Sequence, residues 1–255
     1  MFDLFSDIFA ARDNVLTRID PRPKLVLALA AIMVVVVSRR MIIPGVTAVS
    51  CLAVMVGLRI PLKLILRRLV APLSIVLVIV ALHVLLVGHT PLGAVTIFKW
   101  RVVAYAEGLD QGLLLGLRVL GAVSVMLLLS SVTPAHRIFH ALRFFHIPEE
   151  WVEVALLVYR YTFTLVGQTS DVAAAQKIRL GYSSFRRAMA SIGLLAGTVM
   201  ARSMDQAFRT HEAMVLRGYE GRLFFSNLPA LTTRDRLLMY LGLCFLAGCY
   251  LLIEL

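Results

Sequence analysis

The chain has 255 residues, of which 60% are hydrophobic and 16% charged, and its mean hydropathy is +0.86. Soluble domains are roughly 45–50% apolar and about 25% charged, so we expect a polytopic membrane protein, not a secreted enzyme or a disordered chain. Cys51, Cys244 and Cys249 all lie in apolar runs, which argues against a disulfide framework or a thiolate zinc site. The net charge of +11 comes without any nucleic-acid-binding motif, so we expect no nucleic-acid partner.

Five apolar runs have, or nearly have, the roughly 20 residues needed to cross a bilayer. They are residues 25–37, 41–58, 70–88, 113–132 and 237–253. A sixth apolar stretch, residues 151–167, contains Arg160, and its depth in the membrane stays open. The pattern predicts an all-α integral membrane protein with about five transmembrane helices and a cytoplasmic module of amphipathic helices.

Basic residues are concentrated before the first run and between the second and third runs. The positive-inside tendency therefore predicts a cytoplasmic N-terminus, in a multi-pass protein of the cell inner membrane. Asp3, Asp7 and Asp13 interrupt the first fifteen residues, so we expect no cleavable signal peptide. The outer connection around residues 91–107 alternates in the manner of strands, which indicates a small hairpin.

The runs divide the chain into three parts: a membrane domain with four spans (1–132), a cytoplasmic coupling-helix module (133–235) and a final transmembrane helix (236–255). The middle part is too long and too helical in pattern to be a simple loop. Thr133-Pro134 is typical of a helix start. The next residues predict an amphipathic helix on the membrane surface that ends before Pro148.

Four side chains could carry chemistry but have plainer interpretations. His136 and His140 have the spacing of two ligands on one metal, yet no acidic residue follows until Glu149, so they also fit two surface histidines. Arg118, near one end of the fourth span, either extends to the interface or lines a pathway. Arg160 fits an anchor of the cytoplasmic module to the membrane better than a substrate ligand.

Gly193, Gly197 and Ala201 recur every four residues, which leaves one face of the predicted helix without large side chains. Faces of this kind let two helices cross closely. We therefore expect a helix crossing at this stripe.

Ser203, followed by Gln206, has the pattern of a capping box, so we expect one helix to end near Arg202 and another to begin after Ser203. The second helix should end at Arg217, with Gly218 in the left-handed C′ position. Two arginines would then stand at helix ends about fifteen residues apart. They either complement the helix dipoles locally or bind carboxylates on a partner.

With these features the chain resembles a known family, the transmembrane T component of energy-coupling factor (ECF) ABC importers, specifically the CbiQ-like cobalt and nickel permeases. The resemblance covers nearly the whole chain. It is carried by Asp20-Pro21-Arg22-Pro23-Lys24, Thr133-Pro134, Arg160-Tyr161, Ala201-Arg202-Ser203 and Leu216-Arg217-Gly218. The last two triplets look like the two Ala-Arg-Gly-type coupling motifs of the family, with Ser203 in place of the first glycine and Leu216 in place of the second alanine.

The resemblance implies a non-catalytic subunit whose coupling motifs dock into grooves on two ATPase subunits, or on a homodimer. Ala201, Arg202 and Ser203 would contact one ATPase subunit, and Leu216, Arg217 and Gly218 the other. Their motion would be passed to a separate substrate-binding membrane subunit, with cobalt or nickel as the substrate. The chain has no Gly-x-x-x-x-Gly-Lys-[Ser/Thr] loop, so we expect no cofactor here and place ATP and Mg on the partners.

Two other functions remain as alternatives. An integral-membrane metal-dependent enzyme could use His136 and His140, but it needs acidic residues nearby, and the spans contain almost none. A self-sufficient secondary carrier would place ionisable residues or broken helices near mid-membrane. The spans offer only Arg118 for that purpose.

Overall fold

The computed structural model describes residues 19–254 apart from residues 89, 98–99, 146 and 222–231, and describes residues 91–104 by their backbone only. The acidic residues on which the signal-peptide expectation rests lie outside these described residues. The chain divides into two compact units, residues 1–141 with 230–255 and residues 142–229. The sequence placed the corresponding boundaries after residues 132 and 235.

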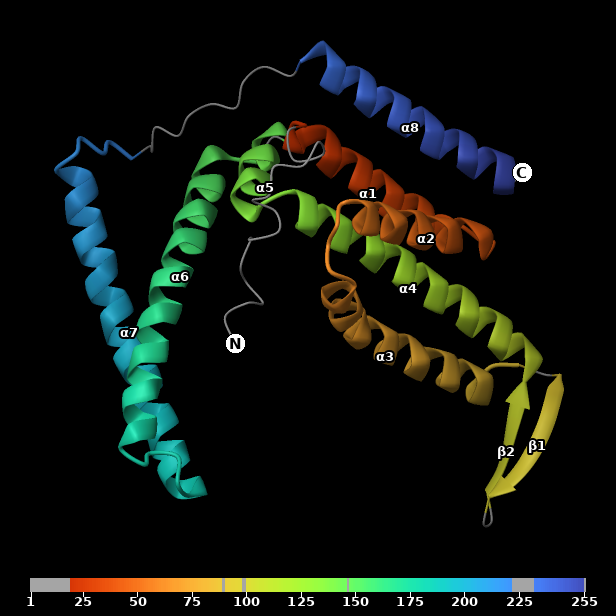
Figure 1. The fold of residues 1–255 in the computed structure, drawn as a ribbon, viewed down its shortest axis with the longest axis horizontal. Coiled ribbons are helices and arrows are strands. Elements are labelled where there is room, and N and C mark those ends of the chain that lie inside the picture. The colour runs from red at the N-terminus through yellow and green to blue at the C-terminus, as the bar shows by residue number, and fades with distance from the viewer. Residues whose placement is uncertain (1–18, 89, 98–99, 146, 222–231, 255) are drawn as a thin grey trace. The chain divides into compact units, whose positions relative to one another are not determined.

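The first unit consists of helices and a β-hairpin (Figure 1). Its helices are α1 (Pro21–Val37), α2 (Ile42–Gly57), α3 (Leu62–Leu86), α4 (Ala106–Val132), α5 (Ala135–Leu142, which ends one residue beyond the unit) and α8 (Thr233–Glu254). Of the described helices, α3, α4 and α8 are long and apolar enough to cross a membrane. With 17 and 16 residues, α1 and α2 extend about 26 and 24 Å, less than a hydrocarbon core of roughly 30 Å. The protein is an all-α integral membrane protein, as predicted, with one small hairpin.

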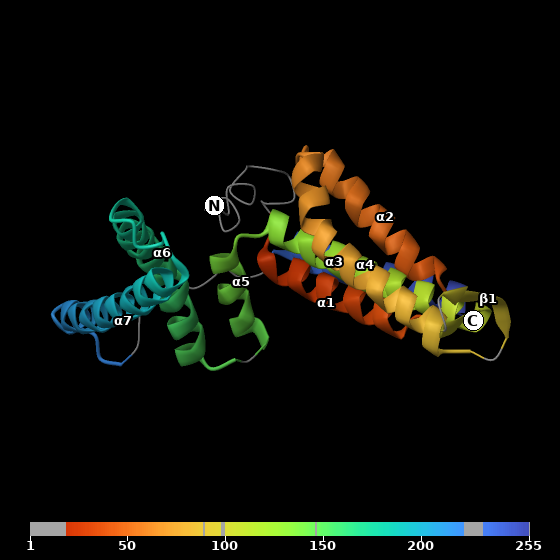
Figure 2. The same ribbon diagram turned by 90° about the horizontal axis from the view of Figure 1, so that it is seen from below.

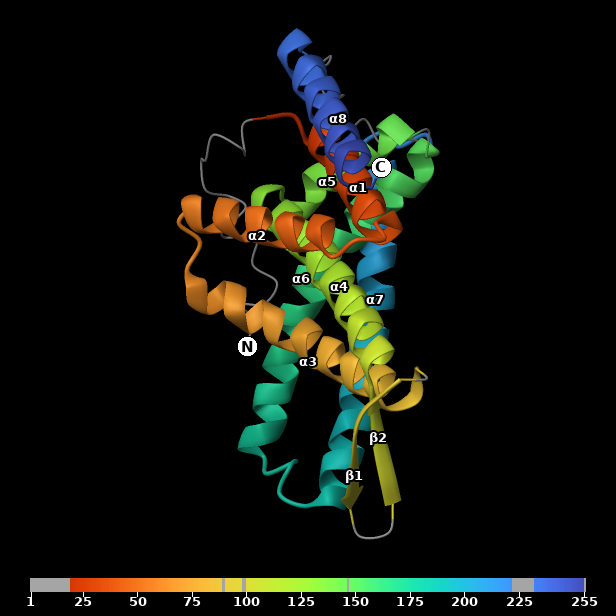
Figure 3. The same cartoon turned by 90° about the vertical axis from the view of Figure 1, so that its right-hand side faces the viewer.

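That hairpin joins α3 to α4 and confirms the strand pattern predicted around residues 91–107. Its strands are β1 (Pro91–Ile97) and β2 (Trp100–Tyr105), which pair antiparallel from Pro91 opposite Tyr105 to Ile97 opposite Trp100. The register shifts once, between Pro91 and Gly93. Figure 3 shows the hairpin at the point where α3 and α4 converge.

The start of α1 follows from the Asp-Pro pair in the sequence. The Asp20 side chain accepts a hydrogen bond of 3.1 Å from the Arg22 backbone N–H, and Pro21 occupies the first helical position. Both are favoured at helix N-termini. Thr133, by contrast, does not cap the next helix as predicted, because its hydroxyl has no hydrogen-bond partner among the described residues. Its backbone N–H donates to Leu129 at the end of α4.

Glycines in α4 allow α3 and α4 to approach closely. Gly108, Gly112 and Gly116 are spaced every four residues and are buried. A Cβ on Gly108 would overlap the backbone carbonyl of His83, and a Cβ on Gly112 would lie 3.1 Å from the Cα of Val80. This is the geometry of a small-xxx-small crossing, and it lies in a helix for which the sequence analysis did not predict one.

Arg118 contacts the end of α1 in the first unit, and its placement at the interface or along a pathway stays a prediction. Its guanidinium donates from Nε and Nη2 to the Ser38 carbonyl, at 3.0 and 2.6 Å, and so caps the C-terminal end of α1. The buried Ser38 hydroxyl donates to Glu254 Oε1 at 2.9 Å. Glu254 also accepts the Arg40 backbone N–H. The tight α1–α2 turn is therefore held by α4 on one side and by the last turn of α8 on the other.

The second unit is a long helical hairpin. A 3₁₀ turn (Arg143–Phe145) precedes α6 (Glu149–Ile178) and α7 (Phe185–Val215). The two helices are neighbours along the hairpin (Figure 2), with 30 and 31 residues, or about 45 Å each. Neither belongs to the described helices that are apolar enough to span a membrane, although α6 includes the apolar stretch 151–167.

Candidate functional site

The hairpin that carries the predicted coupling residues is fixed at its turn by side-chain hydrogen bonds. Gln176 donates from Nε2 to the Ser191 carbonyl at 2.9 Å, and the Ser191 hydroxyl donates to the Gly181 carbonyl at 3.0 Å. The Tyr182 hydroxyl donates to Gln176 Oε1 at 2.8 Å. These bonds connect the end of α6, the turn and the first part of α7.

Farther along, the hairpin is tied by Tyr161 of α6, part of the Arg160-Tyr161 pair. The Tyr161 and Thr210 hydroxyl oxygens are 3.1 Å apart, and Gln206 Nε2 donates to the Thr210 hydroxyl at 3.3 Å. A cavity of about 350 Å³ lies beside this contact, between the two helices. Arg160 itself is exposed, and its predicted role as a membrane anchor stays a prediction.

The predicted break at Ser203 is absent, since α7 runs without interruption from Phe185 to Val215. The Ser203 hydroxyl donates backwards to the Met200 carbonyl at 2.7 Å, and the Gln206 side chain turns to Thr210. The capping-box interpretation was therefore wrong. Arg202 lies in the helix interior, so it cannot complement a dipole at a helix end.

Arg202 lies at a small polar recess in the second unit. The recess has a volume of about 250 Å³ and is lined by Gln168, Arg202, Asp205, Gln206 and Arg209. Arg202 is exposed and forms no ion pair with any described residue. Gln168 Oε1 is buried beside it without a hydrogen-bond partner in the described part of the chain. The recess thus presents two guanidinium groups, the Asp205 carboxylate and an unpaired amide oxygen.

Arg217 follows directly on the end of α7, as the sequence indicated. The Gly218 backbone N–H donates to Val215 and the Tyr219 N–H donates to Met214, both at 3.0 Å. Gly218 has a φ of +80°, so it occupies the left-handed C′ position of a Schellman motif. This ending leaves the Arg217 side chain exposed, without an ion pair among the described residues.

Arg202 therefore lies inside α7, and Arg217 lies just beyond its C-terminal end. Fifteen residues separate them, which corresponds to about 22 Å along the axis. Within the second unit, both side chains are open to solvent. A partner could contact each of them at a separate point.

The small-residue stripe of α7 is open as well. Hypothetical Cβ atoms on Gly193 and Gly197 would meet no atom within 4 Å, and Ala201 is exposed. The described residues therefore make no close helix crossing on this face. The predicted crossing stays a prediction.

Large apolar side chains also remain uncovered on α7, which has no buried residue. The exposed ones nearest the two arginines are Met200, Met204, Phe208, Val215 and Leu216, and Leu216 is 88% exposed. Contiguous exposed apolar surface of this kind marks interaction sites. Helical periodicity places Met200, Met204, Phe208 and Val215 on the side of α7 opposite Arg202 and Arg217, with Leu216 beside the arginines. The side that carries Arg202, Leu216 and Arg217 is called the α7 face below.

His136 and His140 both belong to α5 in the first unit. Among the described residues, no group of three or more His, Cys, Asp or Glu side chains is placed to hold a metal ion. The geometry therefore adds no support to the metal-dependent enzyme considered above.

Fold and site together define a multi-pass helical membrane protein whose second unit exposes a face suited to protein contacts. The chain belongs to the CbiQ family, described as cobalt transport protein, which matches residues 12–226. It is thus a transmembrane component of that transport family, whose members are permease components and not enzymes.

Individual relatives agree with the family. The chain is 28% identical over 214 residues to an uncharacterised protein of Methanocaldococcus jannaschii, covering 84% of this chain and 80% of that one. It is 32% identical over 103 residues to the cobalt transport protein CbiQ of Rhodobacter capsulatus, covering 40% of this chain but only 42% of that one. A putative fused cobalt transport protein CbiMQ of Methanocorpusculum labreanum is 26% identical over 104 residues, 41% of this chain and 17% of that protein.

Proposed function

We propose that the chain is the non-catalytic coupling subunit, or T component, of an ECF-type ABC importer for cobalt or nickel. It passes ATP-driven motion from two ATPase subunits, or a homodimer of one, to a membrane subunit that binds the substrate. ATP and Mg are bound by the ATPase partners, and this chain holds no cofactor. It resides in the cell inner membrane with its N-terminus in the cytoplasm.

The α7 face is the observation that carries the proposal. Arg202 and Arg217 are exposed and have no ion pair among the described residues. A guanidinium binds a carboxylate through two parallel hydrogen bonds in a fixed geometry. Leu216, which directly precedes Arg217, is 88% exposed and would be buried on docking, the usual arrangement around arginine hot spots.

The spacing of the two arginines supports two docking points. About 22 Å along the helix axis is too far for a single side-chain pocket and fits one contact on each of two related subunits. The recess at Arg202, with Asp205 and Arg209, and the Schellman ending at Arg217 are different local surroundings. We therefore assign each motif to its own ATPase subunit.

Cobalt is proposed as the substrate because the family and two of the relatives are described as cobalt transport proteins. The fused CbiMQ description of the Methanocorpusculum relative supports a further membrane component beside this one. In this arrangement the neighbouring membrane subunit selects the ion, so nickel is the alternative cargo.

Charge reversal of the two arginines tests the proposal. Arg202→Glu and Arg217→Glu should each weaken retention of the ATPase subunits at least about tenfold, the effect of losing one hot-spot arginine. ATP-dependent uptake of radioactive cobalt should fall in parallel. Arg186→Glu, an exposed arginine at the other end of α7, is the matched control and should behave like the wild type.

Normal ATPase retention and normal uptake in both variants would contradict the coupling function. Uptake without any ATPase subunit would instead support a self-sufficient carrier. Loss of a hydrolytic activity on replacing both His136 and His140 by alanine would support the enzyme.

A further inference from the structure

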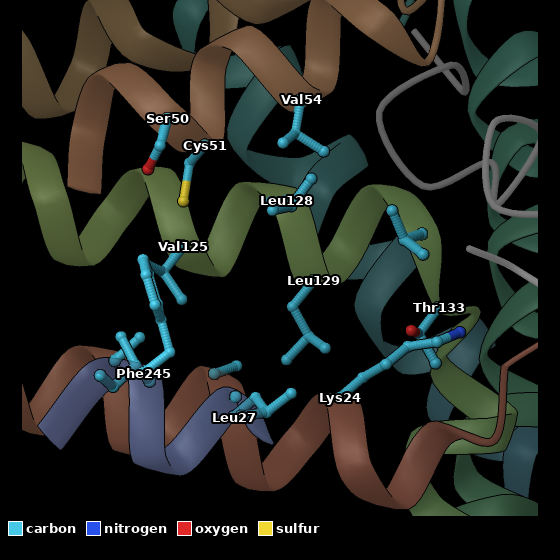
Figure 4. A pocket seen from close by; sticks show the side chains of 15 residues that line it. Lys24, Leu27, Ser50, Cys51, Val54, Val125, Leu128, Leu129, Thr133 and Phe245 are labelled. Atoms are coloured by element: carbon cyan, nitrogen blue, oxygen red, sulfur yellow. The ribbon is translucent and has the colours of Figure 1, made fainter. Parts of the chain in front are cut away.

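The first unit contains an open apolar cavity of about 520 Å³ between α1, α2, α4 and α8 (Figure 4). Its walls are almost entirely apolar and include Leu27, Val54, Val125, Leu129 and Phe245. The volume lies within the range of small-molecule binding sites. In a membrane protein, such a space suits a hydrocarbon chain.

One end of the cavity is polar. Thr133 is 2% exposed, and its hydroxyl has no hydrogen-bond partner within the described part of the chain. A buried hydroxyl without a partner is costly, so a ligand that bonds to it is favoured. The Lys24 side chain extends toward Thr133 at the same end (Figure 4). The cavity thus combines apolar walls with a hydroxyl and an ammonium group at one mouth.

The charges around Lys24 leave it available to an anion. Arg137 adds a second positive charge nearby, whereas Asp20 and Asp235 are the neighbouring negative groups. Asp20 already caps α1 through the Arg22 N–H, and Asp235 lies in the first turn of α8. Both carboxylates therefore offset the positive ends of helix dipoles.

We infer that this cavity binds one acyl chain of an anionic phospholipid, whose phosphate accepts hydrogen bonds from Lys24 and the Thr133 hydroxyl. Lys24 directly precedes the apolar run 25–37, so it stands where a spanning segment meets the headgroup region. The acyl chain then fills the space along α1 and α4, where hydrocarbon is the solvent. The inference concerns only the first unit and does not depend on the coupling function.

Native mass spectrometry of the purified, delipidated full-length chain tests the headgroup contacts. Phosphatidylglycerol should bind more tightly than phosphatidylcholine. Lys24→Gln should weaken phosphatidylglycerol binding about tenfold, because a hydrogen bond from a charged donor is lost. Thr133→Val should weaken it by a smaller factor. Lys63→Gln, an exposed lysine of α3 outside the cavity, is the control and should bind as the wild type does.

Alkylation with a maleimide locates the bound chain. Cys51 lines the cavity, whereas the exposed Cys244 does not, so phosphatidylglycerol should slow the modification of Cys51 severalfold and leave that of Cys244 unchanged. Equal protection by phosphatidylcholine, or unchanged binding in both Lys24→Gln and Thr133→Val, would overturn the inference. Protection by inorganic phosphate alone, or only by a partner membrane subunit, would overturn it as well.

Discussion

A Cβ on Gly108 has no room in the contact between α3 and α4. It would overlap the His83 carbonyl and lie 2.5 Å from the Val87 carbonyl oxygen. Both obstacles are backbone atoms, which no side-chain rotation can move, so Gly108→Ala must push α3 away from α4. By contrast, a Cβ on Gly197 of α7 meets nothing within 4 Å. The same substitution should therefore have opposite effects at the two sites.

The magnitudes follow from two opposing terms. Overpacking of a well-packed contact costs about 1–3 kcal/mol, and the backbone overlap places Gly108 at the upper end. Replacing a helical glycine by alanine returns about 1 kcal/mol through helix propensity. Gly108→Ala should thus lose about 2 kcal/mol of unfolding free energy, which lowers the unfolding midpoint by about 4–8 °C. Gly197→Ala should be neutral or up to about 1 kcal/mol more stable.

Thermal unfolding of the full-length chain in detergent, followed by circular dichroism, measures both effects. Gly112→Ala should fall between them, since its Cβ would lie 3.1 Å from the Val80 Cα and require a smaller shift. Equal midpoints for Gly108→Ala and Gly197→Ala would refute the close crossing of α3 and α4.

Three further substitutions test single contacts. Arg118→Leu removes both hydrogen bonds to the Ser38 carbonyl and should lower the unfolding free energy by about 1.5–3 kcal/mol; an unchanged unfolding midpoint would contradict the cap on α1. Met204→Pro should lower the unfolding free energy by about 3 kcal/mol and reduce the helical circular dichroism signal, because α7 is continuous there. Wild-type helicity would instead support a new helix that begins after Ser203, because proline is tolerated at a first helical position. Gly218→Ala, at φ +80°, should lower the unfolding free energy by about 1–2 kcal/mol and weaken ATPase retention through Arg217. Wild-type retention would show that the Schellman motif at Gly218 is not needed for binding through Arg217.

The apolar runs located the membrane helices but not their lengths. The fourth predicted span began at residue 113, whereas α4 begins at Ala106. Glu107 and Asp110 lie in the helical turns before residue 113. A span predicted from hydropathy stops at charged residues, even where the backbone stays helical. Helix ends that depend on neighbouring residues could be predicted from the sequence, as with Asp20-Pro21 at the start of α1 and Gly218 after α7.

The error at Ser203 has a physical origin. A serine hydroxyl can accept from a backbone N–H at a helix start, or donate to a carbonyl one turn earlier inside a helix. In α7 it does the second, with Met200 as the acceptor. Gln206 finds its partner in Thr210. Sequence spacing alone does not distinguish the two arrangements, because both keep the same residues in the same register.

Two stripes of small residues illustrate a similar limit. In α4, Gly108 and Gly112 meet the backbone of α3 and Gly116 meets the Val76 side chain, whereas Cβ atoms on Gly193 and Gly197 of α7 would meet no atom within 4 Å. The spacing is the same, so the pattern predicts that a close approach is sterically possible. It does not identify the approaching helix, which depends on tertiary contacts and on other subunits.

The continuity of α7 alters the mechanics of the proposed coupling. With a break at Ser203, each arginine could follow its own ATPase subunit while the joint absorbed the difference. A single helix from Phe185 to Val215 allows no such joint, so motion at Arg202 must reach Arg217 as a shift or tilt of the whole helix. Because Tyr161 and Gln176 bind α7 to α6 at two levels, α6 must move with it. Under the coupling proposal, the element that moves is therefore the α6–α7 hairpin as one body.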